Sequence, residues 1–206
     1  MVFTVTEIYR SDFRIKGSKF LGYLCPAVSQ PDVEKSLEAI KNEHPAATHH
    51  CYAYIINPNE PEEFANDDGE PGGTAGLPIL NTLRSYNLMN ALFISVRYYG
   101  GTKLGKAGLI EAYAASAKEA VEIANLKKVT LIQTYRFNYN YNLQSYIDKL
   151  KNSFTLIELE SKYMASITLK LGCNTSDAAD FENAVKSFRH LLNDFSIEEK
   201  TFHTTD

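Results

Sequence analysis

Residues 91–124, ALFISVRYYGGTKLGKAGLIEAYAASAKEAVEIA, decide how the first part of this chain folds. Residues 91–99 form a continuous, largely apolar run, which is typical of a buried strand. Residues 106–124 are rich in alanine and other good helix formers, so they predict a long helix. The double glycine at 100–101 separates the two patterns. A buried strand that passes through a glycine turn into a helix indicates an α+β fold.

The segments before residue 91 continue this alternation. Residues 19–29 and 47–56, KFLGYLCPAVS and ATHHCYAYII, predict two strands. Residues 31–44 between them predict a helix that begins at Pro31, a residue favoured in the first helical turn. Residues 77–87 carry apolar side chains at helical spacing. We therefore expect a strand–helix–strand unit, then a helix, the buried strand and the long helix.

A change in composition predicts a domain boundary near residue 125, because glycine and proline are concentrated before it and only Gly172 follows it. We expect one domain over residues 1–125 and another over 126–206. The second has the order βαββαβ, the ferredoxin-like split unit, which serves many functions and names none by itself. Its predicted elements are strand 129–141, helix 142–152, strands 155–161 and 163–171, helix 176–192 and strand 195–202.

The composition of the whole chain is that of an ordinary globular protein, with 206 residues, of which 44% are hydrophobic and 22% charged. The N-terminus lacks a signal-like segment, and no apolar run approaches the roughly 20 residues that span a bilayer. We therefore expect a cytoplasmic protein. The three cysteines, Cys25, Cys51 and Cys173, have no CxxC spacing and are predicted to be small buried residues.

The net charge of −4 argues against a surface coated with basic residues for bulk nucleic-acid binding. Residues 1–125 carry 11 basic and 15 acidic side chains, whereas residues 126–206 carry 10 of each. The excess of acid therefore lies in the first part. The strand at 163–171 lacks the aromatic-rich run of RNA-recognition domains, although the order of elements is shared with them.

Residues 66–76, NDDGEPGGTAG, cannot form a core, since acids and glycines dominate them. The stretch fails as an EF-hand loop, because Pro71 and Leu77 occupy the sixth and twelfth positions. The acids could share another hard cation, but such a cluster is more typical of a solvated turn. The glycines allow a positive φ and close approach of the backbone to a partner. The acids are Asp67, Asp68 and Glu70, and the glycines concerned are Gly72, Gly73 and Gly76.

Residues 100–107, GGTKLGKA, resemble a phosphate-binding P-loop that follows a strand and opens a helix. Ala107, however, stands where a hydroxyl should hold Mg²⁺, so an NTPase is not predicted. A weaker prediction remains. The loop backbone, the helix N-terminus and Lys103 or Lys106 could bind a phosphate or a carboxylate.

Three further side chains are candidates for chemistry. His49 and His50 should face opposite sides of their strand, so both cannot serve one site. His49 shares a face with Cys51, which leaves a nucleophile pair open in principle, although no third orienting group can be identified. Arg97 ends the buried strand and either faces a ligand pocket there or pairs with an acid of the neighbouring loop, for example Asp67 or Asp68.

Three motifs together resemble the IMPACT/YigZ family: THHCYAY at 48–54, DDGEPGGTAGLPIL at 67–80 and RYYGGTKLGKAGLIEAY at 97–113. The resemblance to its N-terminal domain covers about residues 1–125, and the rest is similar to the C-terminal domain of YigZ-type members. It implies an N-terminal βαβ fold like the second domain of a small-subunit ribosomal protein. It also implies a C-terminal domain like those of ribosomal translocases.

The resemblance also implies a role in translation. Eukaryotic IMPACT regulates translation under amino-acid stress by binding the ribosome-associated activator of an initiation kinase, a partner that does not transfer to bacteria. The resemblance therefore suggests a stress-response regulator or nucleic-acid-binding protein that acts through the ribosome, RNA or a ribosome-associated protein, without a cofactor or metal. The alternative is a hydrolase, or an enzyme for a small phosphorylated or carboxylated substrate, that uses His49, Arg97 and residues 66–76, which we call the acidic loop.

Positions that match the family motifs become the candidate binding residues. Two positions depart from the family pattern, Ala107 and Glu111, and both weaken the nucleic-acid interpretation. A third interpretation is that the glycines only allow tight packing. The matching positions are His49, Asp67, Asp68, Gly69, Glu70, Gly72, Gly73, Gly76, Arg97, Gly100, Gly101, Lys103, Gly105 and Gly108.

Overall fold

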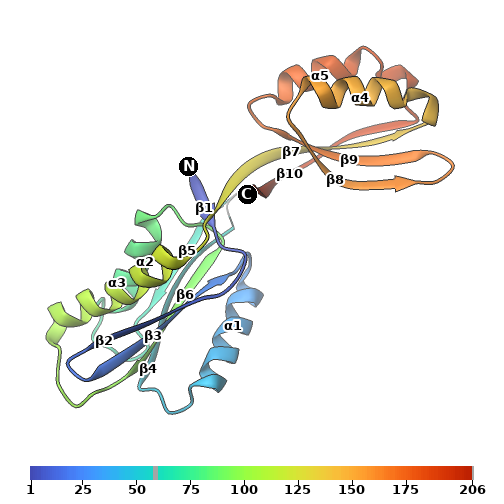
Figure 1. Cartoon of the computed structure of the whole chain (residues 1–206). Helices are drawn as coiled ribbons and strands as arrows, with labels where there is room; N and C mark the ends of the chain where they lie inside the picture. The colour runs from blue at the N-terminus through green and yellow to red at the C-terminus, as the bar shows by residue number, and fades with distance from the viewer. Residues whose placement is uncertain (58–59, 206) are drawn as a thin grey trace. The chain divides into compact units, whose positions relative to one another are not determined.

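The computed structural model describes residues 1–57 and 60–205 of the chain (Figure 1). These residues form two compact units. The first runs from Met1 to Val129 and includes the last residues from Thr204, and the second runs from Thr130 to His203. Both units combine helices with one antiparallel sheet, so the predicted α+β class is confirmed. No helix in this part of the chain has the length and apolar character that a bilayer crossing requires.

The first unit is built on a five-stranded sheet in the order β2-β3-β6-β4-β5, with every neighbouring pair antiparallel. Strands β3 and β4 both flank β6 and are therefore parallel to each other, joined by α1 in the expected strand–helix–strand unit. The bounds are β2 Tyr9–Ile15, β3 Ser18–Pro26, α1 Gln30–Glu43, β4 His49–Ile56, β5 Glu62–Asn66 and β6 Ala91–Tyr98.

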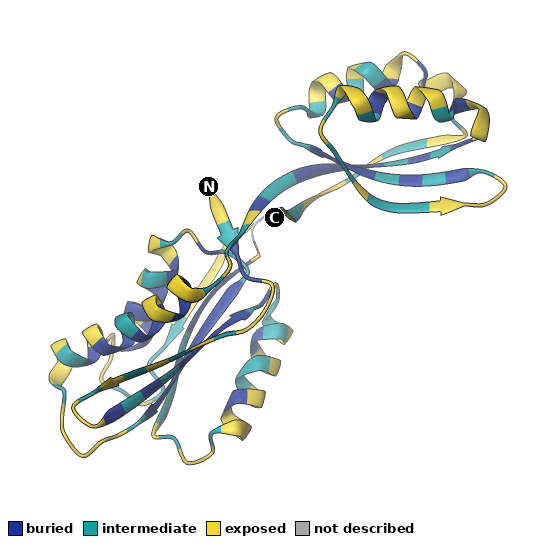
Figure 2. Cartoon of the chain, in the orientation of Figure 1, coloured by how far each residue is buried: buried dark blue, intermediate teal, exposed yellow. Residues whose placement is uncertain are grey.

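Helices cover both faces of this sheet, so its central strands are buried on each side (Figure 2). Helix α1 packs on one face over Tyr54 and Ile56 of β4. Helices α2 (Gly76–Ser85) and α3 (Gly105–Ile123) pack on the other face over Cys51 and Ala53. The alternation along β4 confirms that His49 and His50 lie on opposite faces.

Three strands of the first unit were not predicted from the sequence. Strand β1 (Val2–Thr4) pairs with residues 127–129 of β7 (Lys127–Tyr139). Strands β2 and β5 form the two edges of the sheet, where one side of the ladder remains free. Their charged residues interrupt the apolar pattern, as in YRSDFRI of β2, because edge strands with exposed side chains need no continuous apolar run.

The second unit has the strand order β10-β7-β9-β8, which is the ferredoxin-like arrangement predicted from the sequence. Its core contains Tyr135, Phe137 and Phe181 beneath the two α-helices. The bounds are β7 Lys127–Tyr139, η1 Tyr141–Leu143, α4 Gln144–Ser153, β8 Leu156–Tyr163, β9 Ile167–Asn174, α5 Ala178–Lys186, η2 Arg189–Leu191 and β10 Asp194–Thr205.

Two predicted boundaries in the second unit were wrong by four or more residues. The strand expected at 163–171 begins at Ile167, because Tyr163 still belongs to β8 and the intervening residues form a hairpin turn. The helix expected to end at Leu192 ends at Lys186 and is followed by a short 3₁₀ turn.

Candidate functional site

The candidate site centres on a buried ion pair between Arg97, at the end of β6, and Glu70 of the acidic loop. The two side chains are only 6% and 4% exposed. Glu70 Oε1 also accepts a hydrogen bond of 2.8 Å from the hydroxyl of Tyr113. The alternative in which Arg97 pairs with an acid of the neighbouring loop is therefore confirmed, although the partner is Glu70 and not Asp67 or Asp68, the two acids suggested from the sequence.

The sheet register places Arg97 between Phe20 of β3 and His49 of β4. Its guanidinium carbon lies 5.4 Å from the centre of the Phe20 ring and 5.5 Å from that of Tyr99, both within cation–π range. Ser18 Oγ is 3.4 Å from Nη2. The Nε atom is buried and has no hydrogen-bond partner among the described residues.

Asp67 fixes the acidic loop to the start of α2. Its carboxylate accepts hydrogen bonds of 2.8 to 2.9 Å from the backbone N–H groups of Gly73, Ala75 and Gly76. Burial raises the pKa of Asp67, but these three bonds outweigh burial and leave the pKa below its usual value. The carboxylate thus takes the place of an N-cap for α2, whose own N-cap residue, Ala75, has no acceptor side chain.

Asp68 joins the loop to β4. Its Oδ2 atom accepts the backbone N–H of His50 at 2.6 Å, and its carbonyl oxygen accepts Nδ1–H of His49 at 2.7 Å. His49 Nε2 lies 3.8 Å from Glu70 Oε1, so this histidine belongs to the Arg97–Glu70 cluster. The His50 ring lies on the opposite face, with Nε2 at 3.2 Å from the His44 carbonyl oxygen.

Cys51 is a structural residue of this region. Its side chain is buried, and burial raises the pKa of the thiol far above its usual value. The sulfur lies 3.0 Å from the Asp67 carbonyl oxygen and 3.3 Å from the Tyr113 hydroxyl. A thiol in this setting stays protonated, so the geometry gives no support to the Cys51–His49 nucleophile pair.

The glycines fall into two groups. A Cβ added at Gly100 would lie 1.9 Å from the backbone of Gly17, and one at Gly76 would lie 2.5 Å from that of Asn66. Packing therefore demands glycine at these two positions. A Cβ added at Gly72, Gly73, Gly101 or Gly105 would meet no atom within 4 Å. The last three of these have a positive φ, whereas Gly72 is constrained neither by φ nor by neighbours.

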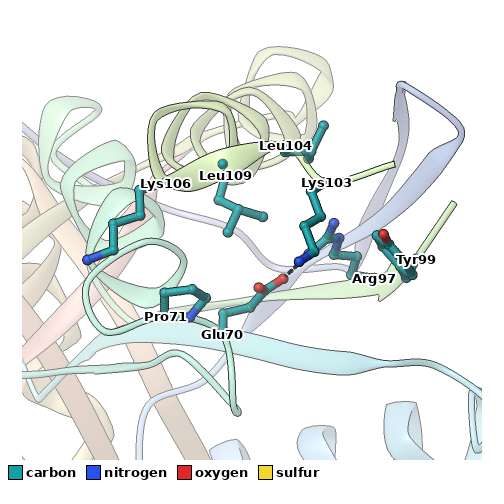
Figure 3. A pocket seen from close by; sticks show the side chains of 9 residues that line it. Glu70, Pro71, Arg97, Tyr99, Lys103, Leu104, Lys106 and Leu109 are labelled. Carbon is teal, nitrogen blue, oxygen red and sulfur yellow. Dashed lines mark hydrogen bonds and ion pairs between the residues drawn. The ribbon is translucent and has the colours of Figure 1, made fainter. Parts of the chain in front are cut away.

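A cleft of about 420 Å³ opens between the Arg97–Glu70 pair and the first turn of α3 (Figure 3). We call it the α3 cleft. Its size falls within the range of small-molecule sites, roughly 300–1,000 Å³. The cleft is formed by the acidic loop, the end of β6, the glycine loop (residues 100–105) and the start of α3. It is lined by Glu70, Pro71, Arg97, Tyr99, Lys103, Leu104, Gly105, Lys106 and Leu109.

Among the predicted site residues, Glu70, Arg97, Lys103 and Gly105 line the α3 cleft, and His49 lies against Glu70. The carboxylates of Asp67 and Asp68 instead accept the backbone hydrogen bonds that hold the loop, so the three acids do not converge on one point. In the described part of the chain no three His, Cys, Asp or Glu side chains are grouped as a metal would require.

Sequence reasoning missed Tyr113, Tyr99 and the apolar lining of the cleft. Tyr113 lies four residues after Leu109 on α3, where both side chains are buried. Helical spacing of this kind marks a core residue and gives no signal for the hydroxyl that reaches Glu70. Tyr99 follows the buried strand directly, and the residue is 46% exposed.

Comparison with known proteins places the chain in a family. The model of the Impact N-terminal domain matches residues 16–121. IMPACT family member YigZ of Escherichia coli is 30% identical over 188 residues, which cover 90% of this chain and 92% of that protein. The chain belongs to the IMPACT family. Member YvyE of Bacillus subtilis is 35% identical over 150 residues, 73% of this chain and 68% of YvyE.

A crystal structure described as that of a hypothetical protein has a TM-score of 0.66 against this IMPACT family chain, with 27% identity. The alignment covers 96% of this chain and 98% of that one, so the likeness extends over both units. Every residue that lines the α3 cleft lies inside the segment matched by the Impact N-terminal model. The cleft is thus part of the domain that defines the family.

Proposed function

We propose that this chain is a binding protein that acts in the regulation of translation, through the ribosome, RNA or a ribosome-associated protein. Membership of the IMPACT family supports the connection to translation, because the eukaryotic members are expected to act there. The proposed mode of action is recognition of a partner by the first unit, without chemical conversion of a substrate.

One observation carries the choice of binding over catalysis: the carboxylates and the thiol of the site are engaged in holding the fold. Glu70 is occupied by Arg97 and Tyr113. Asp67 is occupied by three backbone N–H groups, and the Cys51 thiol is buried. A general base or a nucleophile needs a free lone pair that points at substrate. The lysines and the open glycine backbone, which suit binding, remain exposed.

Co-sedimentation with ribosomes at low salt tests the proposal, together with a pull-down in which tagged protein is recovered with bound RNA and protein. We expect a retained partner that is released as salt increases, since phosphate contacts weaken steeply with ionic strength. The Lys103→Gln variant, which removes an exposed positive charge, should lose the partner more readily than the Lys118→Gln variant, which alters an exposed ion pair elsewhere on the same unit.

Two results would refute the proposal. If neither ribosomes nor RNA nor any protein is retained at low salt, the binding role fails. If the protein instead hydrolyses generic esterase, phosphatase or peptidase substrates, and Asp68→Ala removes that activity, the enzymatic alternative replaces it.

A further inference from the structure

The α3 cleft combines two features that are usually found together in sites for organic anions. Part of its lining is apolar and comes from Pro71, Leu104 and Leu109. The rim is cationic, with Lys103 and Lys106 exposed beside it (Figure 3). Ligand sites typically join an apolar surface with a few convergent polar groups in this manner.

The charge of the cleft is positive. Arg97 and Glu70 neutralise each other as a buried pair. Lys103 and Lys106 have no ion-pair partner within the described residues, so about two positive charges remain at the rim. An anion that enters the cleft therefore meets uncompensated positive charge.

The backbone at the same place offers hydrogen-bond donors. Helix α3 begins at Gly105 after the N-cap Leu104, which provides no side-chain acceptor, so the first-turn N–H groups are left without a cap. Gly105 has a φ of +72° and open space where a Cβ would stand, so its backbone is accessible from the cleft. An uncapped helix start of this kind attracts negative charge.

A second, independent observation points to a ligand at this location. Arg97 is one of the lining residues, its side chain is more than nine-tenths buried, and its Nε–H donor has no partner among the described residues. Buried donors are nearly always satisfied, so the unpaired Nε–H leaves Arg97, beside the cleft, with hydrogen-bonding capacity that the fold does not use.

We propose that the α3 cleft binds a small organic anion, with a phosphate or carboxylate group at the start of α3 and an apolar or aromatic body against Leu104, Leu109 and the Tyr99 ring. The exposed Tyr99 ring gives a flat surface on which a planar body can stack. This site goes beyond the proposed function, because it concerns a small molecule, and it stands whichever macromolecular partner is found.

Titration of the full chain with simple probes, followed by methyl NMR of Leu104 and Leu109, tests the site. The probes are phenyl phosphate, benzoate, inorganic phosphate and benzyl alcohol. Phenyl phosphate or benzoate should give saturable shifts, and whichever binds more tightly identifies the oxyanion. Inorganic phosphate lacks the body and benzyl alcohol lacks the charge, so each should bind on the order of tenfold more weakly.

The double variant Lys103→Gln/Lys106→Gln should weaken binding of the better probe by at least about tenfold and reduce its salt dependence. The matched control is Lys118→Gln, an exposed lysine on the same helix that pairs with Glu122. Binding by Lys118→Gln should equal that of the unchanged protein. Both substitutions are on the surface, and circular dichroism verifies that the variants fold.

Two results would overturn the proposal. One is the absence of saturable shifts with both phenyl phosphate and benzoate at millimolar concentration. The other is equal affinity of the lysine double variant and the Lys118→Gln control. Ribosome or partner binding is measured separately, so failure of the small-molecule site leaves the proposed function intact, and the reverse also holds.

Discussion

Replacing Glu70 by alanine should destabilise the first unit by about 3–5 kcal/mol, the usual cost of removing one member of a buried ion pair. Two contributions add up to this value. The hydrogen bonds from Arg97 and Tyr113 to the carboxylate are lost, at roughly 1.5–3 kcal/mol for bonds to a charged group. The Arg97 guanidinium, only 6% exposed, then remains buried without a counter-charge.

Hydrogen exchange of the β6 amides measures this change, because Ile94 and Val96 are fully buried in the first unit. The measurement therefore reads the free energy of opening of that unit alone. The control is Glu63→Ala, which breaks an ion pair with Arg84 whose side chains are 31% and 48% exposed. This exposed pair should contribute much less to stability.

A double substitution separates lost bonds from a stranded charge. Glu70→Leu combined with Arg97→Met removes both charges and keeps apolar volume, so it should recover much of the stability lost in Glu70→Ala. The reasoning is wrong if Glu70→Ala lowers the free energy of opening by less than about 1 kcal/mol, or if the double variant is as unstable as the sum of its two single substitutions.

Three further predictions concern the neighbouring contacts. Asp67→Ala should lower the free energy of unfolding by about 1–3 kcal/mol at neutral pH, because three hydrogen bonds from backbone N–H groups are lost. These bonds lower the pKa of Asp67 because they stabilise its ionised form. In urea unfolding, the difference between the variant and the unchanged protein should therefore shrink as pH falls below 3.8, the usual pKa. Gly100→Ala should lower the melting temperature markedly through the clash with Gly17. Gly72→Ala should change the free energy of unfolding by no more than the roughly 0.5 kcal/mol typical of surface substitutions, and so should hardly move the melting temperature. Equal losses of melting temperature in the two variants would refute the division of the glycines. Burial lowers the pKa of His50, although the His44 carbonyl and Asp68 act in the opposite direction. As pH falls, His50 is therefore protonated in the unfolded chain before it is protonated in the folded chain, and the free energy of unfolding should fall below about pH 6.5. His50→Gln should flatten that part of the pH profile of stability, and an unchanged profile would contradict this prediction.

The fold was largely predictable because its central elements carry strong local signals. The apolar run of β6 and the alanine-rich α3 could hardly form anything else. The edge strands β2 and β5 could not be predicted, since an exposed strand next to a paired one is stabilised by the ladder and not by its own pattern. The order of strands in the second unit followed from its βαββαβ sequence.

The site was predictable as a neighbourhood but not as a set of contacts. Motifs indicated that the acidic loop, Arg97 and the glycine loop belong together, and the cleft joins them. Which acid meets Arg97 depends on the path of the loop, where Asp68 takes a φ of +43° and Gly69 a φ of +87°. No one-dimensional pattern specifies that turn, so Glu70 could not be singled out in advance.

The charge that the site presents also could not be summed from the sequence. Three acids in the loop and a net charge of −4 suggest a face that repels anions. Each acid is instead paired with a donor of the same unit: Asp67 with backbone N–H groups, Asp68 with the His50 N–H, and Glu70 with Arg97. Because fixed donors compensate these carboxylates, the charges left at the α3 cleft are those of its lysines. An acidic protein thereby carries a local site that favours anions, and the acids serve to shape it.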